Sequence, residues 1–153
     1  MYGGFAGNEP TSYDLSQRDL AATVTILDGL HVRRVLYLPI DFSKETVWDG
    51  FTIQNGRVEG NGAGAYLRDH GVLSHCKLSH NMADQGGGIF AEGTSAIHNC
   101  LISNNEASSN GGGLYMNQST IEVVNATIVR NWADGNGCGV YGFGGNLRNC
   151  VVW

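Results

Sequence analysis

The amino-acid sequence predicts an all-β fold, a right-handed parallel β-helix with three-sided coils of about 24–26 residues. Three observations lead to this prediction. A glycine-rich phrase recurs at nearly constant spacing, apolar residues form columns at the same spacing, and residues that tolerate a left-handed backbone recur at three places in each repeat. A period between about 20 and 50 residues indicates a solenoid, and the right hand follows from the general preference of parallel crossovers.

The glycine phrase sets the period. It reads GAGAY at 62–66, GGGIF at 86–90, GGGLY at 111–115 and GCGVY at 137–141, with steps of 24, 25 and 26 residues. Each glycine in a strand or corner costs about 0.5–1 kcal/mol relative to alanine. The phrase therefore marks positions where a side chain does not fit, and we expect it to stack at one corner.

Two apolar columns predict the strands between corners. They consist of Ile53, Leu78, Ile102, Ile128 and Val152, and of Phe51, Cys76, Cys100, Ala126 and Cys150. The columns lie two residues apart, which is the period of a strand and not of a helix. Cys76 and Cys100 fall on adjacent coils, at a distance compatible with a disulfide. Free thiols that act as small hydrophobic groups are the simpler interpretation, because Ala126 fills the same place.

Glycine, asparagine and histidine tolerate positive φ and predict the corners. The first corner column is Gly29, Gly50, His75, Asn99, Asn125 and Asn149, the second is Gly56, Asn81, Asn105 and Asn131, and the third is the glycine phrase. We expect stacked asparagine side chains to form hydrogen-bonded ladders between coils.

The rhythm is looser before Phe51. TVTILDG at 23–29 and TVWDG at 46–50 both end in Asp-Gly and flank VLYLPIDF at 35–42, which predicts one shorter coil. The polar stretch 8–22 has no period and is predicted to be a loop or short helix. The sequence therefore predicts one domain over 1–153, with a loop or cap region at 1–22 and coils over 23–153.

Composition excludes several function classes. Of 153 residues, 15% are charged, the net charge is −5, and the nine lysines and arginines form no cluster, so we expect no nucleic-acid partner. No apolar run reaches the roughly 18–20 residues that span a bilayer, so we expect no membrane insertion.

The chain resembles the right-handed parallel β-helix repeat proteins of the pectate-lyase-like class, especially large secreted or cell-surface proteins of Bacteroidetes and related bacteria. The phrases that carry the resemblance are YGGFAGNE, QRD, VTILDG, VLYL, DGFTIQNG and the GGGIF…NCLISNNEA…GGGLY repeats. The resemblance implies an exported protein, secreted or on the cell surface. A polysaccharide or a cell-surface glycan could be its partner. The class includes lyases, hydrolases, adhesins and stalks, so its fold does not fix an activity.

The resemblance also implies that this chain is a piece of a longer β-helix. The last phrase, NCVVW at 149–153, stops in the middle of a coil, and its apolar strand has nothing after it to cover it. We therefore expect the C-terminal coil to contact neighbouring coils of a longer parent chain, or to self-associate.

Asp28 and Asp49 are the candidate catalytic pair. If the two Asp-Gly corners stack, the carboxylates lie on neighbouring coils, with Arg33 or Arg34 near enough to serve as the base of a polysaccharide lyase or glycoside hydrolase. The alternative is that each aspartate only caps its own turn through a local hydrogen bond.

Candidate metal ligands form a second acidic column. Glu59, Asp84 and Asp134, interrupted by Ser108, could hold Ca²⁺ between coils or could simply keep a turn solvated. His75 and His80 flank Cys76, but the sequence has no second ligand pair at zinc spacing. We therefore expect no zinc and no other cofactor.

The last candidate site is the aromatic column Tyr66, Phe90, Tyr115 and Tyr141, which follows the aliphatic column Ala65, Ile89, Leu114 and Val140. Rings that face outward could stack on sugars as a glycan platform, and rings that face inward would be core. The aliphatic column suits the interior better, which favours outward rings. The sequence thus predicts a non-catalytic module, a stalk or adhesin with a carbohydrate-contacting face. The alternative is a lyase or hydrolase, and a third is a spacer without a ligand.

Overall fold

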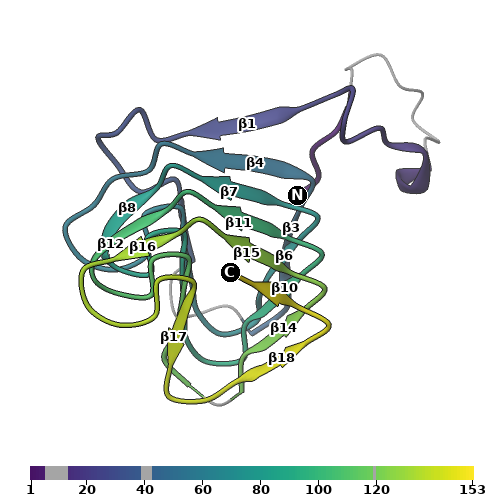
Figure 1. Cartoon of the computed structure of the whole chain (residues 1–153). Coiled ribbons are helices and arrows are strands. Elements are labelled where there is room, and N and C mark those ends of the chain that lie inside the picture. Colours follow the sequence, from purple (N-terminus) through teal and green to yellow (C-terminus); the bar gives the residue numbers. More distant parts are fainter. Residues whose placement is uncertain (6–13, 39–42, 119) are drawn as a thin grey trace.

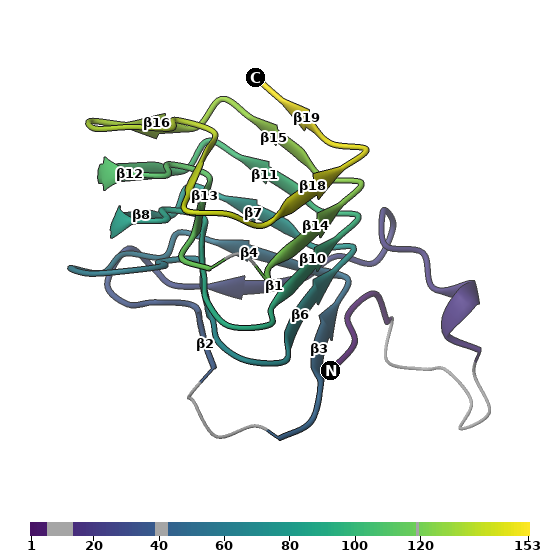
Figure 2. The same ribbon diagram turned by 90° about the horizontal axis from the view of Figure 1, so that it is seen from below.

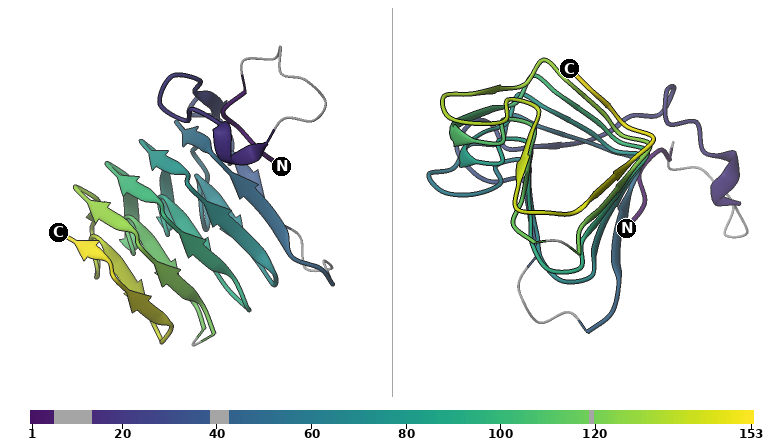
Figure 3. Two further views of the ribbon diagram at one scale, coloured as in Figure 1. Left: turned by 90° about the vertical axis from the view of Figure 1, so that its right-hand side faces the viewer. Right: turned by 60° about the horizontal axis from the view of Figure 1, so that its bottom comes forward.

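Short parallel strands wind into a three-sided solenoid in the computed structural model, which describes residues 1–5, 14–38, 43–118 and 120–153 (Figure 1). The described strands stack in about five coils. Seen close to the solenoid axis, each coil has a triangular section with an arm that projects from one corner (Figure 3). The predicted fold class and three-sided coil are confirmed, and the arm is an addition to the prediction.

Three sheets form the walls and a fourth forms the arm. The six-stranded sheet contains β1 (Thr25–Asp28), β4 (Phe51–Gln54), β7 (Lys77–Ser79), β11 (Leu101–Ser103), β15 (Thr127–Val129) and β19 (Val151–Val152). The arm sheet contains β8 (Met82–Gln85), β12 (Glu106–Asn110) and β16 (Trp132–Ala133). The aromatic sheet contains β2 (Leu36–Tyr37), β5 (Ala65–Leu67), β9 (Ile89–Ala91), β13 (Leu114–Met116) and β17 (Val140–Gly142). The closing sheet contains β3 (Thr46–Asp49), β6 (Gly71–Ser74), β10 (Ala96–His98), β14 (Glu122–Val124) and β18 (Asn146–Arg148).

The strand register confirms the predicted apolar columns. Ile53 pairs with Leu78, Leu78 with Ile102, and the column continues through Ile128 to Val152. The first four of these side chains are fully buried in the main core, as are Ala65, Ile89 and Leu114 of the aromatic sheet, whereas Val140 in the last coil is partly buried. A fixed period keeps like residues above one another, so each coil buries its interior against its neighbours.

Two of the three predicted corner columns have positive φ, and the third is displaced. Gly50, His75, Asn99, Asn125 and Asn149 are left-handed, as are Gly62, Gly86, Gly111 and Gly137 at the start of each glycine phrase. The remaining corner, however, turns at Asn55, His80, Asn104 and Arg130, one residue before the predicted column. That column instead places the side chains of Asn81, Asn105 and Asn131 in an internal ladder.

The glycine phrase is confirmed as a crowded corner. A Cβ at Gly88 would lie 2.5 Å from the carbonyl oxygen of Gly113, and one at Gly113 would lie 2.6 Å from that of Gly139. Both contacts join neighbouring coils. The third glycine of each phrase is therefore required by close backbone approach between coils, whereas the first is required by its φ.

The first coil differs from the predicted stacking. Residues 23–50 do form strands, β1 to β3, but β1 pairs with β4 in the six-stranded sheet while β3 belongs to the closing sheet. Gly29 therefore lies opposite the turn at Asn55 and not above Gly50, and its φ is not positive. In the predicted cap region, the described residues include a 3₁₀ helix, η1 (Leu15–Gln17), beside the first coil (Figure 2). The parts of these predicted segments at 6–13 and 39–42 lie outside the residues that the structure describes.

The two ends of the solenoid differ. At the N-terminal end Tyr2 forms a parallel bridge with Asp49, so residues 1–3 run along the edge of β3. At the other end the core columns reach the surface: Leu147 is 38% exposed and Val152 46%, whereas Val123 and Ile128, one coil earlier, are fully buried. The last described coil therefore presents apolar core residues and the edges of β17, β18 and β19.

Candidate functional site

The register separates the two candidate catalytic aspartates. Asp28 lies opposite Gln54 in the six-stranded sheet, and Asp49 lies opposite Ser74 in the closing sheet. The expectation that they stack on neighbouring coils is wrong, because the two Asp-Gly sequences end strands of different walls. The described residues therefore provide no acid–base pair from Asp28 and Asp49.

Asp28 caps its own turn. Its carboxylate accepts hydrogen bonds from the backbone N–H of Leu30 at 2.8 Å, from Gln54 Nε2 at 2.8 Å and from Asn55 Nδ2 at 3.0 Å. These bonds, with that from Gln54 contributing most, lower the pKa of the exposed Asp28 carboxyl. The local-capping interpretation is confirmed for Asp28, whose ionised carboxylate accepts hydrogen bonds from its own turn and from the neighbouring coil.

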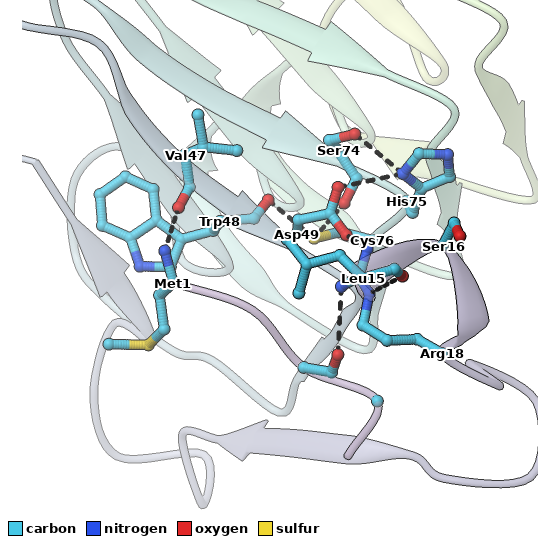
Figure 4. Close-up of polar contacts among 12 residues, drawn as sticks. Met1, Leu15, Ser16, Arg18, Val47, Trp48, Asp49, Ser74, His75 and Cys76 are labelled. Atoms are coloured by element: carbon cyan, nitrogen blue, oxygen red, sulfur yellow. Dashed lines mark hydrogen bonds and ion pairs between the residues drawn. The ribbon is translucent and has the colours of Figure 1, made fainter. Parts of the chain in front are cut away.

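Asp49 lies at the centre of a polar cluster with Arg18, Ser74 and His75 (Figure 4). Arg18 Nη2 donates to Asp49 Oδ1 at 2.6 Å, and His75 Nδ1 lies 3.1 Å from Asp49 Oδ2. Burial alone would raise the pKa of the Asp49 carboxyl, but the hydrogen bonds from His75, Arg18 and Ser74 outweigh it and lower that pKa. Asp49 is thus a buried, ionised anchor rather than a cap of its own Asp-Gly turn.

The same cluster contains serine, histidine and aspartate but lacks the geometry of a nucleophilic triad. Ser74 Oγ lies 2.9 Å from His75 Nδ1, the same ring nitrogen that contacts Asp49. A serine relay needs the hydroxyl and the carboxylate on opposite nitrogens of the ring. His75 therefore cannot pass a proton from Ser74 toward Asp49.

Arg18 makes this cluster a structural link between the N-terminal residues and β3. We call the contacts of Arg18 with Asp49, Gly3 and Leu15 the clasp. The Arg18 guanidinium donates to the carbonyl oxygens of Gly3 and Leu15 at 3.1 and 2.9 Å, and lies 5.3 Å from the centre of the Tyr2 ring. It therefore ties residues 1–5 and η1 to β3. Sequence reasoning missed this role, because Arg18 belongs to an aperiodic polar stretch and its partner is set only by the fold.

The acidic column is engaged in local bonds along the arm. Asp84 accepts from the backbone N–H of Gly60 at 2.8 Å and from Ser108 Oγ at 3.0 Å, and Asp134 accepts from Trp132 Nε1 at 3.1 Å. Among residues 1–5, 14–38, 43–118 and 120–153, no three acidic, histidine or cysteine side chains gather as a set of metal ligands. The structure thus brings neither Glu59, Asp84 and Asp134 nor His75, Cys76 and His80 together as such a set.

The aromatic column faces away from the main core but is not open to solvent. Tyr66, Phe90 and Tyr115 form a separate cluster and are only 9%, 3% and 6% exposed. Adjacent ring centres are 5.0 Å apart for Tyr66 and Phe90 and 4.9 Å for Phe90 and Tyr115, and both pairs are stacked. Each ring therefore covers the flat face of the next. The expected direction is right, but Tyr66, Phe90 and Tyr115 do not present the open ring faces expected for sugar stacking. Tyr141, at the end of the stack, is tilted against Tyr115 and partly buried.

Arginines cover the N-terminal end of this column. Arg34 lies 5.1 Å from the Tyr37 ring centre and 5.3 Å from that of Tyr66, and it donates to the carbonyl oxygens of Asn61 and Gly62. Arg68 lies 5.2 Å from the Tyr66 ring centre and donates to the Tyr66 hydroxyl at 3.2 Å. Burial raises the pKa of that hydroxyl. These cations lie against the Tyr37 and Tyr66 rings and stabilise them.

A groove lies along the arm. It has a volume of about 890 Å³ and is lined by His31, Arg33, Arg34, Arg57, Glu59 and Asp84 together with apolar residues such as Val58 and Met82. The side chains of Arg33 and Arg57 are exposed and make no hydrogen bond or ion pair with the described residues. Glu59, Asp84 and Ser108 in its lining belong to the acidic column that the repeat predicts, whereas Arg33 and Arg57 lie in segments without a periodic pattern and were not predicted to meet there.

The coil geometry, the asparagine ladder and the stacked aromatic column define a parallel β-solenoid. Comparison with protein families adds the hand and the membership: residues 40–153 match the family described as "Right handed beta helix region", and the chain belongs to that family. Comparison with curated proteins and with solved structures finds no match. The described residues contain no helix long and apolar enough to cross a membrane.

Proposed function

We propose that this chain is a non-catalytic β-helix module of an exported surface protein, serving as a rigid stalk or adhesin segment. The observation that carries the proposal is how the polar groups are used. Asp28, Asp49 and Asp84 accept hydrogen bonds from neighbouring coils or turns, and the asparagines bond from coil to coil. Side chains committed in this way stiffen the stack and are not available to a substrate.

The arm groove is the surface on which an adhesin of this shape would contact a glycan. Its unpaired arginines can donate to hydroxyl or carboxylate oxygens, and Glu59 can accept from hydroxyls. This assignment replaces the aromatic column, whose ring faces are covered. Because the groove is open and the side chains of Arg33 and Arg57 are exposed, we expect weak binding rather than a tight single site.

Two measurements test the proposal. The purified protein is incubated with acidic and neutral polysaccharides, with and without Ca²⁺, and reducing ends and unsaturated products are assayed. We expect no turnover, and turnover that disappears in Asp28→Asn or Asp49→Asn would favour a lyase or hydrolase instead.

Glycan binding is measured separately with Arg57→Ala and, as a matched control away from the groove, Arg148→Ala. Binding that neither variant changes would reject the groove, and absence of binding to any glycan would favour a pure stalk.

A further inference from the structure

Cys76 and Cys100 occupy the same place on neighbouring coils. Each directly precedes a strand, Lys77 at the start of β7 pairs with Leu101 at the start of β11, and the Leu101 N–H donates to the carbonyl oxygen of Cys76 at 2.9 Å. Parallel strands lie roughly 4.8 Å apart. The two Cα atoms therefore fall within the range of about 4.4–6.8 Å that disulfides bridge.

The two thiols also have equivalent orientations. Cys76 Sγ contacts the carbonyl oxygen of Ser74 at 3.2 Å, and Cys100 Sγ contacts that of His98 at the same distance. Both side chains are buried in the main core. Cβ atoms that point the same way from neighbouring strands need to approach by only a few tenths of an ångström to reach disulfide geometry, about 3.5–4.5 Å.

The other two cysteines lack such a neighbour. Cys150 makes the same type of contact, with the carbonyl oxygen of Arg148 at 3.2 Å, but Ala126 separates it from Cys100 in the column. Cys138 is exposed in the glycine phrase of the last coil. The column therefore contains one adjacent pair of thiols, Cys76 and Cys100. Cys150 serves as the control, a cysteine in the same orientation with no thiol on the neighbouring coil.

We propose that Cys76 and Cys100 form a disulfide between coils under oxidising conditions and so tie the coil beginning at β7 to the coil beginning at β11. The oxidant is a small-molecule disulfide such as glutathione disulfide. One cysteine thiolate attacks a glutathione sulfur and releases one glutathione thiolate, which leaves a mixed disulfide. The second cysteine thiolate then attacks the protein sulfur of that bond and releases the other glutathione thiolate. The two cysteines lose two protons and two electrons, and glutathione disulfide gains them.

Burial determines when this reaction occurs. Contact with Cys76, together with burial, raises the pKa of the Cys100 thiol, which disfavours its thiolate in the closed core. We therefore expect rapid oxidation while the chain folds and slow oxidation of the folded protein. The bond, once formed, lies in the core and resists reduction.

The test uses the complete 153-residue protein, refolded with glutathione and glutathione disulfide, and a reduced sample as reference. The reduced protein has four free thiols. We expect the oxidised protein to have two, to yield a linked peptide pair containing Cys76 and Cys100, and to melt roughly 5–10 °C higher. Four remaining thiols, a linkage through Cys138 or Cys150, or an unchanged or lower melting temperature would overturn the proposal.

A matched set of variants tests the geometric reason. Cys76→Ala should leave three thiols and no internal disulfide, and alanine already occupies this column at Ala126 without disturbing the stack. Moving the pair by one coil, with Cys76→Ala, Cys150→Ala and Ala126→Cys combined, should restore one disulfide, now joining Cys100 to the new cysteine. Failure of this folded variant to form it would contradict the argument from column adjacency.

Discussion

The buried asparagine ladder offers the sharpest test of what holds the coils together. Asn105 lies at its centre and is 1% exposed. Its Oδ1 accepts from the backbone N–H of Asn81 at 3.1 Å and from Asn81 Nδ2 at 2.9 Å, and its Nδ2 contacts Asn131 Oδ1 at 3.0 Å and the carbonyl oxygen of Leu78 at 3.1 Å. Replacing Asn105 with alanine removes all four contacts.

The magnitude follows from what remains unpaired. Asn81 Nδ2 keeps its bond to the carbonyl oxygen of Ile53, but the backbone N–H of Asn81 loses the partner that the ladder supplies. A buried donor without a partner costs about 1–3 kcal/mol, and each further lost hydrogen bond costs about 1 kcal/mol. With three further bonds lost beside the unpaired Asn81 N–H, we therefore expect Asn105→Ala to reduce the free energy of unfolding by roughly 4–6 kcal/mol.

The assay is equilibrium unfolding in urea followed by circular dichroism, with amide hydrogen exchange read at Asn81. Asn117→Ala is the control, because Asn117 is exposed and makes no side-chain hydrogen bond with the described residues. We expect that control to change the free energy of unfolding by less than about 0.5 kcal/mol. A loss below about 1 kcal/mol in Asn105→Ala, with unchanged protection of the Asn81 amide, would refute the ladder as a major source of stability.

The glycine corner, Asp49 and the C-terminal end can each be tested by one substitution. Gly88→Val should lower the free energy of unfolding by more than about 1 kcal/mol, because a Cβ there would lie 2.5 Å from the Gly113 carbonyl oxygen, and an unchanged urea midpoint would contradict the crowded corner. Because the pKa of the Asp49 carboxyl is lowered in the folded protein, its ionised form stabilises the fold above the unfolded pKa of about 3.9, and this stabilisation is lost as the pH falls through the folded pKa. In thermal melts from pH 6 to pH 3, the melting temperature should therefore fall less in Asp49→Asn than in the wild type. Equal decreases in the two proteins would reject the clasp. The 153-residue protein should self-associate in sedimentation experiments through its exposed end, less so in Val152→Lys, and a monodisperse wild-type monomer would count against this surface.

The strand register shows where sequence reasoning was sufficient and where it failed. From Phe51 onward, the repeat aligns strands correctly because the same column recurs in several coils, so any error of one residue would misplace an entire face. The first coil offers a single comparison, and the matching Asp-Gly endings of Asp28 and Asp49 suggested a false alignment. β1 instead pairs with β4, Thr25 opposite Phe51, at a step of 26 residues that lies within the range of the later repeats, so the apolar column continues back to Leu27.

The displaced corner has a similar explanation. His80 and Asn81 are adjacent residues that can each adopt positive φ or form a ladder, and composition alone does not say which does which. The fold decides, because only one of two successive side chains can point into the coil. The left-handed residue is the one whose side chain points outward, and Asn81 fills the buried position.

The fold class, the period, the core columns and the crowded glycine corner could be predicted from the amino-acid sequence, because each of them recurs and each recurrence is an independent observation. The roles of single residues depended on contacts that the folded chain makes. The tertiary structure tied Asp49 to Arg18, covered the faces of the aromatic rings with one another, and gathered Arg33 and Arg57 in one groove. The physical reason is that repetition encodes local geometry once per coil, whereas a site depends on contacts between unlike segments, which occur once in the chain and leave no period to read.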